Sequence, residues 1–121
     1  MNFTFTNDRP IYLQLIEQLE LYIISGQFSP GDRLPSVRDL AAQAQVNPNT
    51  MQKALQELED KRLIITERTN GKFVTDDAKF ITKQRTKLAT TKIQKFLTEM
   101  QELGLSHADI ISHLETLKRK D

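Results

Sequence analysis

Side chains suited to reading a nucleic acid gather at the start of a helix that the sequence predicts from Pro48. Asn47 suits the N-cap, and proline suits the first helical position because no N–H is needed there. Apolar residues then recur at helical spacing, which leaves the polar ones outward: Asn49, Thr50, Gln52 and Lys53. Amides such as Asn49 and Gln52 can pair with adenine edges in the major groove, and a helix N-terminus favours phosphate. The segment therefore predicts a helix that reads A·T-containing sites.

A second polar cluster lies at the tip of a predicted hairpin. Residues 63–66 and 72–74 are expected as strands and 68–71 as their turn, with Asn-Gly as a strong hairpin signal. The tip is compact and cationic, and such a tip can reach a minor groove or its phosphates: Arg68, Asn70, Gly71 and Lys72. Lys72 and Arg68 also fit a simpler interpretation, in which they only blunt the edge of a small sheet.

A short helix before these elements carries an arginine in its first turn. Ser36 followed by Asp39 predicts a capping box, and the buried stripe would consist of Val37, Leu40, Ala41 and Ala44. Arg38 is a candidate DNA contact on this helix. It could equally be a solvated arginine or a partner of Asp39 or Glu57, and the residues alone leave these alternatives open.

The elements that must position these side chains begin with an amphipathic helix between Pro10 and Gly26. Its apolar residues fall at helical spacing: Tyr12, Leu15, Ile16, Leu19, Tyr22 and Ile23. A turn-rich connector over 28–35 follows, with Arg33-Leu34 expected to be extended. Three helices and then a hairpin predict a winged helix-turn-helix over residues 9–77. The fold class is therefore α+β, mainly α.

Residues 78–121 are predicted as a helical dimerisation segment. A long helix ends at Gly104, and Ser106 with Asp109 predicts the cap of a second helix. Two helices cannot enclose a core alone, so they must pack on the first domain or on a second copy. We expect a two-fold homodimer with this apolar seam: Ile93, Phe96, Met100, Leu103, Ile110, Leu114 and Leu117.

Composition argues against several other classes of protein. The 17 basic and 16 acidic residues give a net charge of +1, so any DNA-facing surface must segregate its charges by face. There is no cysteine, and His107 and His113 do not share a helical face, so neither a metal nor a cofactor is expected. No nucleophile–base arrangement or phosphate loop predicts an enzyme. No apolar run approaches the ~20 residues that span a bilayer, so a cytoplasmic protein is expected.

Several spaced motifs occur in an order that resembles the GntR family of transcriptional regulators. They lie within residues 9–77: Pro10-Ile11-Tyr12-x-Gln14, Gly26, Pro30 through Ala41, Asn47-Pro48-Asn49-Thr50, Ala54-Leu55-x-x-Leu58-Glu59 and Phe73-Val74. The short helical tail and the Asn-Pro-Asn-Thr turn are similar to the YtrA-like subfamily. That subfamily lacks a large effector domain and dimerises through two C-terminal helices.

The resemblance implies a repressor that binds a palindromic operator as a homodimer, often controlling its own operon and transporter genes. It implies that Arg38 contacts a base or a phosphate, and that the start of the next helix faces DNA. The full predicted DNA-contacting set is Ser36, Arg38, Asn47, Pro48, Asn49, Thr50, Gln52, Lys53, Arg68, Asn70, Gly71 and Lys72.

Two departures from the family pattern keep a second function open. Pro48 stands where the family often has arginine, and Asn70-Gly71-Lys72 stands where it often has a Gly-x-Gly wing tip. The alternative is a winged-helix module that binds proteins and has lost DNA binding. A small-molecule effector is also compatible with the family, but no polar constellation in residues 76–121 indicates one. The basic run from Lys79 to Lys95 is interpreted as a solvated helix face.

Overall fold

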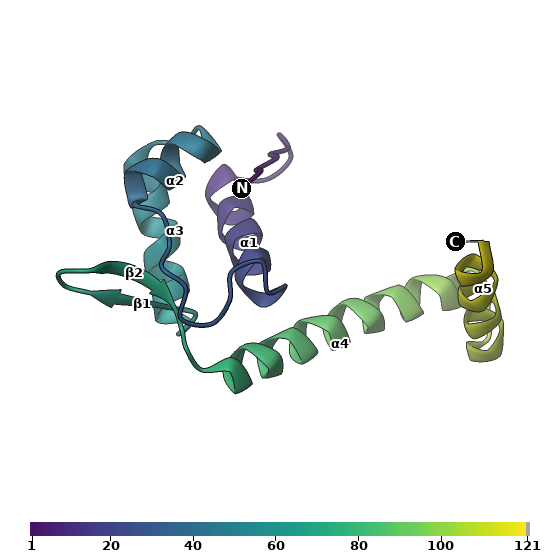
Figure 1. Cartoon of the computed structure of the whole chain (residues 1–121). Coiled ribbons are helices and arrows are strands. Elements are labelled where there is room, and N and C mark those ends of the chain that lie inside the picture. The colour runs from purple at the N-terminus through teal and green to yellow at the C-terminus, as the bar shows by residue number, and fades with distance from the viewer. Residues whose placement is uncertain (121) are drawn as a thin grey trace. The chain divides into compact units, whose positions relative to one another are not determined.

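Within residues 1–120, the chain folds into five helices and one small antiparallel sheet in the order that the sequence predicts (Figure 1). The computed structural model describes residues 1–120, and side chains up to residue 119. The elements are α1 (Ile11–Ile24), α2 (Val37–Ala44), α3 (Pro48–Asp60), β1 (Ile64–Glu67), β2 (Gly71–Val74), α4 (Ala78–Glu102) and α5 (His107–Lys120). The contacts divide the chain into two compact units, Met1–Arg85 and the residues from Thr86 onward. The mainly helical winged-helix prediction is confirmed.

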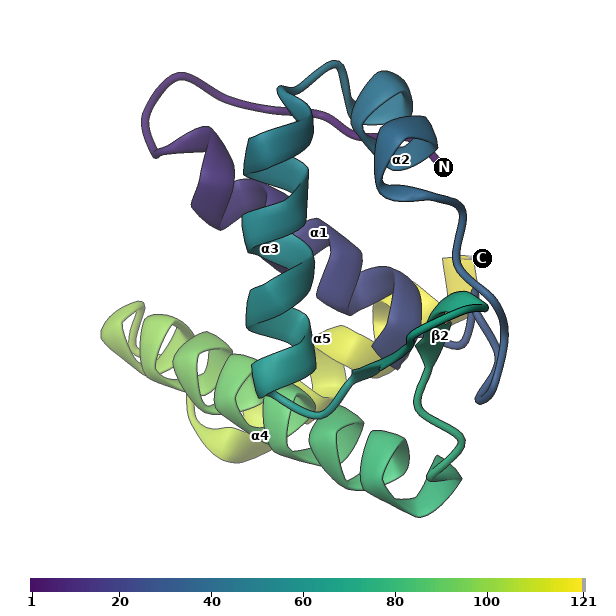
Figure 2. The ribbon, with the colours of Figure 1, turned by 90° about the vertical axis from the view of Figure 1, so that its left-hand side faces the viewer.

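The core of the first unit lies where α3 packs against both α1 and α2; in Figure 2 α1 crosses behind α3 and α2 lies to one side of its upper end. Residues at the predicted helical spacing are fully buried in it, among them Leu15, Leu40, Met51, Leu55 and Leu58. Because these side chains fix the rotation of each helix, the opposite faces of α2 and α3 stay in solvent. Arg85 also secures the end of α1, since its Nε donates to the Ile24 carbonyl over 2.7 Å.

Two tight helix ends set the path of the chain around α3. At the end of α2, Gln45 has a positive φ of 56°, and the Val46 N–H reaches back to the Ala41 carbonyl. At the end of α3, Arg62 has φ 66°, and the Leu63 N–H reaches back to the Leu58 carbonyl. Both are Schellman ends with a non-glycine residue in the left-handed position. The first of them makes the turn between α2 and α3.

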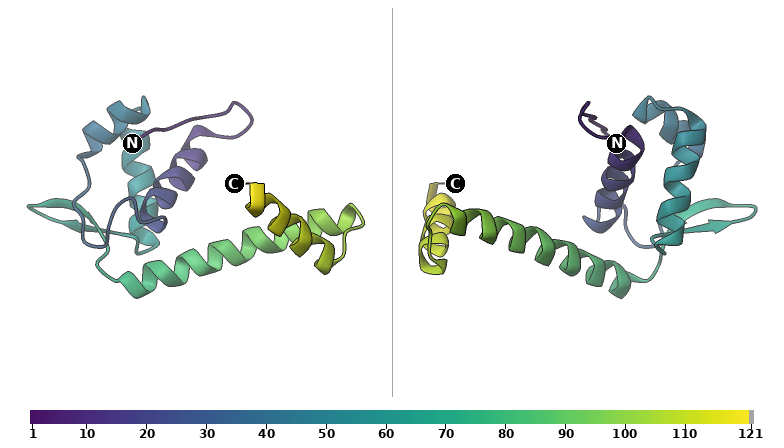
Figure 3. Two further views of the ribbon diagram at one scale, coloured as in Figure 1. Left: turned by 45° about the vertical axis from the view of Figure 1, so that its right-hand side comes forward. Right: turned by 180° about the vertical axis from the view of Figure 1, so that it is seen from behind.

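The hairpin projects from the helices of the first unit in both views of Figure 3. Its pairs are Ile64 with Val74, Ile65 with Phe73, Thr66 with Lys72, and Glu67 with Gly71. Gly71 was predicted in the turn, but it is the first residue of β2, so the loop consists of Arg68, Thr69 and Asn70. Its φ of +103° lets the chain enter β2 without steric conflict. Leu63 was predicted as the first strand residue, but β1 begins at Ile64.

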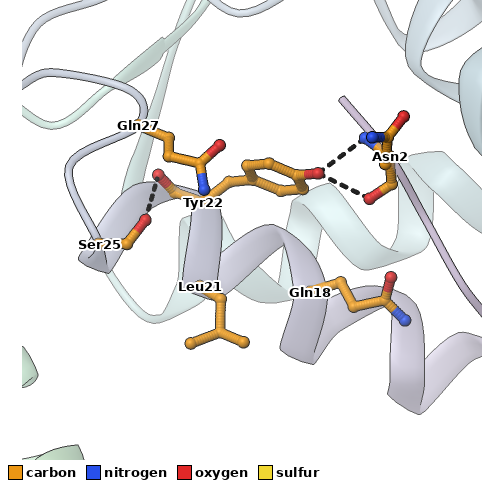
Figure 4. A pocket seen from close by; sticks show the side chains of 6 residues that line it. All are labelled: Asn2, Gln18, Leu21, Tyr22, Ser25 and Gln27. Atoms are coloured by element: carbon orange, nitrogen blue, oxygen red, sulfur yellow. Dashed lines mark hydrogen bonds between the residues drawn. The ribbon is translucent and has the colours of Figure 1, made fainter. Parts of the chain in front are cut away.

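Residues 1–6, called the N-terminal strap here, run along α1 although the sequence predicts no element there. Each of three α1 side chains binds both the N–H and the carbonyl of one strap residue: Gln14 binds Thr6, Gln18 binds Thr4, and Tyr22 binds Asn2. Figure 4 shows the Tyr22 hydroxyl between the two backbone groups of Asn2. Phe3 and Phe5 pack against the core. The strap is therefore part of the first unit.

The second unit contains α4 from Thr86 onward, the turn after it and α5. Gly104 takes a φ of +86°, and the Leu105 N–H reaches back to the Met100 carbonyl. Ser106 and Asp109 form the predicted capping box, with N–H to oxygen distances of 2.9 and 3.1 Å. The Ser106 backbone N–H, followed by the Ser106 hydroxyl, lowers the pKa of Asp109 below its ordinary value. Within residues 1–120, no helix is both long and apolar enough to span a bilayer.

Candidate nucleic-acid interface

The start of α3 is capped as the sequence predicts, and its polar residues face outward. The Asn47 side-chain oxygen accepts the Asn49 N–H over 2.8 Å, with Pro48 in the first helical turn. Asn49, Gln52 and Lys53 are exposed, and Thr50 is half-buried. Because the cap uses one of the two acceptor sites of the Asn47 oxygen, its amide NH₂ and one lone pair remain available to a partner. The exposed edge of α3 therefore offers amide and ammonium groups beside a helix N-terminus.

The start of α2 adds one free cation. The Ser36 hydroxyl accepts the Asp39 N–H over 3.1 Å, which confirms Ser36 as the N-cap. Arg38 is exposed, and among the described residues it forms no ion pair with Asp39 or Glu57. The guanidinium therefore keeps all of its donors for an external partner such as a phosphate or a guanine edge.

Two polar side chains at the hairpin tip already form hydrogen bonds within the hairpin. The Lys72 ammonium donates to the Thr66 hydroxyl over 2.9 Å, and the Asn70 amide donates to the Glu67 carboxylate over 3.1 Å. Arg68 is exposed in the loop and has no such partner among the described residues. The predicted tip residues do lie together, but two of their side chains are engaged within the hairpin.

Arg33, which the sequence analysis did not assign, also lies beside the hairpin. A Cβ added at Gly71 would lie 3.6 Å from both Nε and Nη2 of Arg33. A signal was present, because the extended Arg33-Leu34 segment was expected in the connector before α2. The sequence did not show which strand this segment would lie beside.

The predicted dimerisation residues lie on α4, on α5 and, for Leu103, in the turn between them, and most of them are exposed in the single chain. Ile93, Leu103 and Leu117 are 56, 72 and 60% exposed, and Phe96 and Leu114 are also exposed. Met100 is half-buried and Ile110 only 3% exposed, so Ile110 adds little surface to a seam unless α5 moves. Large apolar side chains are also exposed in the first unit, among them Ile11 and Leu21, so exposure alone does not assign an interface.

Two other classes of site were considered in the sequence, an effector pocket and a metal site. A pocket of about 340 Å³ lies between the N-terminal strap and α1, and it is lined by Asn2, Gln18, Leu21, Tyr22, Ser25 and Gln27 (Figure 4). All six are uncharged, so the pocket offers no ionic anchor for an effector. Among residues 1–120, no group of His, Cys, Asp or Glu could hold a metal ion.

Comparison with known proteins places this arrangement among bacterial regulators. Residues 11–74 match the family described as "Bacterial regulatory proteins, gntR family". A solved GntR family transcriptional regulator from Listeria monocytogenes has a TM-score of 0.86 and 36% identity, covering 93% of this chain and 98% of that one. The transcriptional repressor YtrA of Bacillus subtilis (strain 168) is 46% identical over 70 residues, which are 58% of this chain and 54% of YtrA.

A further solved structure contains DNA. The DNA-binding domain of AraR in complex with operator ORE1 has a TM-score of 0.54 and 25% identity, covering 62% of this chain and 94% of that one. The proteins named here are transcriptional regulators rather than enzymes.

Proposed function

Because the chain belongs to the GntR family of bacterial regulatory proteins, we propose that it is a repressor that binds a palindromic operator as a homodimer. The observation that carries the proposal is the exposed, capped start of α3, which lies next in the chain to the helix bearing an unpaired Arg38. In this proposal residues 9–77 bind DNA and residues 78–121 hold two chains together. The protein would act in the cytoplasm, where bacterial DNA lies.

The exposed residues of α3 suit direct reading of bases. An amide such as Asn49 or Gln52 can donate to N7 and accept from the amino group of adenine in the major groove. Arg38 and Lys53 add positive charge for phosphates or guanine edges. We therefore propose an operator that contains A·T pairs at the positions facing the start of α3. The wing, through Arg68, would contact the neighbouring minor groove or its phosphates.

Exposed apolar residues support the dimeric part of the proposal. Ile93, Leu103 and Leu117 present large apolar surfaces to water in the single chain. A second copy related by a two-fold axis would cover the same residues on both chains at once. A two-fold dimer then presents two recognition helices to an inverted repeat. Control of the chain's own operon and of transporter genes is part of the same proposal, and an operator sequence would identify those genes.

Selection of binding sites from random double-stranded DNA tests the proposal. The purified full chain is incubated with the DNA pool at low salt, bound duplexes are amplified, and the mass of the complex is measured in the same experiment. We expect an enriched inverted repeat bound by two chains. No enrichment at low salt would overturn the proposal and favour the protein-interaction module. An enriched single half-site bound by one chain would overturn the dimeric part.

A further inference from the structure

Arg33 lies in an extended segment beside the outer edge of β2. It forms an antiparallel bridge with Phe73. The Leu34 N–H donates to the Lys72 carbonyl, and the Val74 N–H donates to the Asp32 carbonyl, each over 2.8 Å. The backbone of Arg33 is therefore fixed to β2, whereas residues of the wing loop have no strand beside them.

The ladder determines which face of the wing the Arg33 side chain occupies. Residues paired across a ladder lie on the same face, and residues two apart in a strand also share a face. Arg33, Phe73 and Gly71 are therefore on one face of the hairpin, together with Ile65 and Glu67, which pair with Phe73 and Gly71. Gly71 has no side chain there, and the guanidinium of Arg33 lies within van der Waals range of the space that a Cβ would fill.

The guanidinium of Arg33 lies near Gly71, and no other described side chain binds it. Its side chain is exposed, and within the described part of the chain it has no ion pair or hydrogen bond. Lys72, by contrast, donates to Thr66 from the opposite face of the hairpin. A planar guanidinium can bind a phosphate through two parallel N–H donors, and its charge persists at any physiological pH.

We infer that Arg33 is a DNA-contacting residue of the wing and binds a backbone phosphate beside the groove that the wing enters. This rests on the proposed function, since it needs the wing to lie on DNA. The wing contact then comes from two separate segments, Arg68 in the hairpin loop and Arg33 in the extended segment before α2.

The salt dependence of binding tests the inference. The full chain and its Arg33→Gln variant are titrated with the inverted repeat enriched by selection, over a series of salt concentrations. Each lost phosphate contact lowers the slope of log K against log salt by about 0.9, so a dimer should lose about 1.8. Arg33→Lys keeps the charge and should retain most of the slope. The matched control is Arg9→Gln, which removes an exposed arginine that is paired with Glu17.

The outcomes separate the inference from the proposed function. If the unmodified chain binds the repeat and Arg33→Gln keeps the slope of Arg9→Gln, only the inference is overturned. If the unmodified chain binds no duplex even at low salt, both are overturned. Thermal melting of each variant checks folding. If the Arg33→Gln variant melts at a lower temperature than the unmodified chain, the Arg33→Ala and Arg33→Lys variants are compared instead. Equal salt slopes for these two variants, when both are folded, overturn the inference.

Discussion

Gln14 offers a direct test of the way the N-terminal strap is held. The residue is 5% exposed, and its amide makes four hydrogen bonds. The oxygen accepts from the Thr6 N–H (2.8 Å) and the Thr6 hydroxyl (3.2 Å). The NH₂ group donates to the carbonyls of Thr6 (3.0 Å) and Arg9 (2.7 Å). Gln14→Ala removes all four and leaves three backbone groups without these partners.

The expected loss of stability follows from these contacts. A typical hydrogen bond contributes about 1 kcal/mol net, so the three bonds to backbone groups contribute roughly 3 kcal/mol. Thr6 and Arg9 are exposed residues, and water can partly replace the amide in the variant. We therefore expect about 2 kcal/mol. In a unit of this size each kcal/mol shifts Tm by roughly 4–8 °C, so Tm should fall by about 8–16 °C.

Gln18→Ala is the matched control for this measurement. Gln18 binds the N–H and carbonyl of Thr4 in the same manner, but its bonds lie in exposed surroundings. Water should replace them at little net loss, so we expect less than about 1 kcal/mol. Thermal melting by circular dichroism at one protein concentration compares the two variants, and hydrogen exchange reports on the Thr6 N–H. A loss for Gln14→Ala no larger than that for Gln18→Ala would refute the reasoning.

Two further predictions concern the helices of the DNA-binding unit. Arg62→Gly should stabilise the chain by about 0.5 kcal/mol, because a left-handed non-glycine residue costs about 1–2 kcal/mol and glycine loses about 0.5–1 kcal/mol through entropy. A urea midpoint that does not rise would contradict this. Arg38→Ala should weaken binding to the enriched repeat by roughly 1–3 kcal/mol. Unchanged affinity in a fluorescence titration would remove Arg38 from the interface.

The helix starts could be predicted because each cap involves residues only two or three positions apart. Ser36 with Asp39, Asn47 with Asn49, and Ser106 with Asp109 all form hydrogen bonds between near neighbours. The side chain and the backbone group that it binds are therefore visible in the same short segment. The same locality made the outward residues of α3 predictable, since burial of one helix face fixes the other.

The N-terminal strap could not be predicted for the opposite reason. Gln14 and Gln18 fall four residues apart on α1, a spacing that indicates only one shared face. Their partners are backbone groups of an extended segment, and any residue supplies such groups. Tyr22 was interpreted as part of the apolar stripe, and its hydroxyl binds Asn2 as well. Only the folded chain shows that these three side chains bind the same segment.

The hairpin shows why the charged residues of a wing cannot be assigned from their types alone. A two-residue Asn70-Gly71 turn would pair Glu67 with Val74, whereas the structure pairs Ile64 with Val74, and both of these side chains are buried. Burial of two β-branched side chains outweighs the preference of Asn-Gly for the shortest turn, and so the core sets the register. That register places Lys72 opposite Thr66, and Arg33 lies beside Gly71 on the other face, which it shares with Glu67. The core beneath the wing therefore determines which of its cations lack a partner. A substitution at Ile64 or Val74 that shifts the pairing should change DNA binding in a fluorescence titration without altering any of the residues proposed to contact DNA.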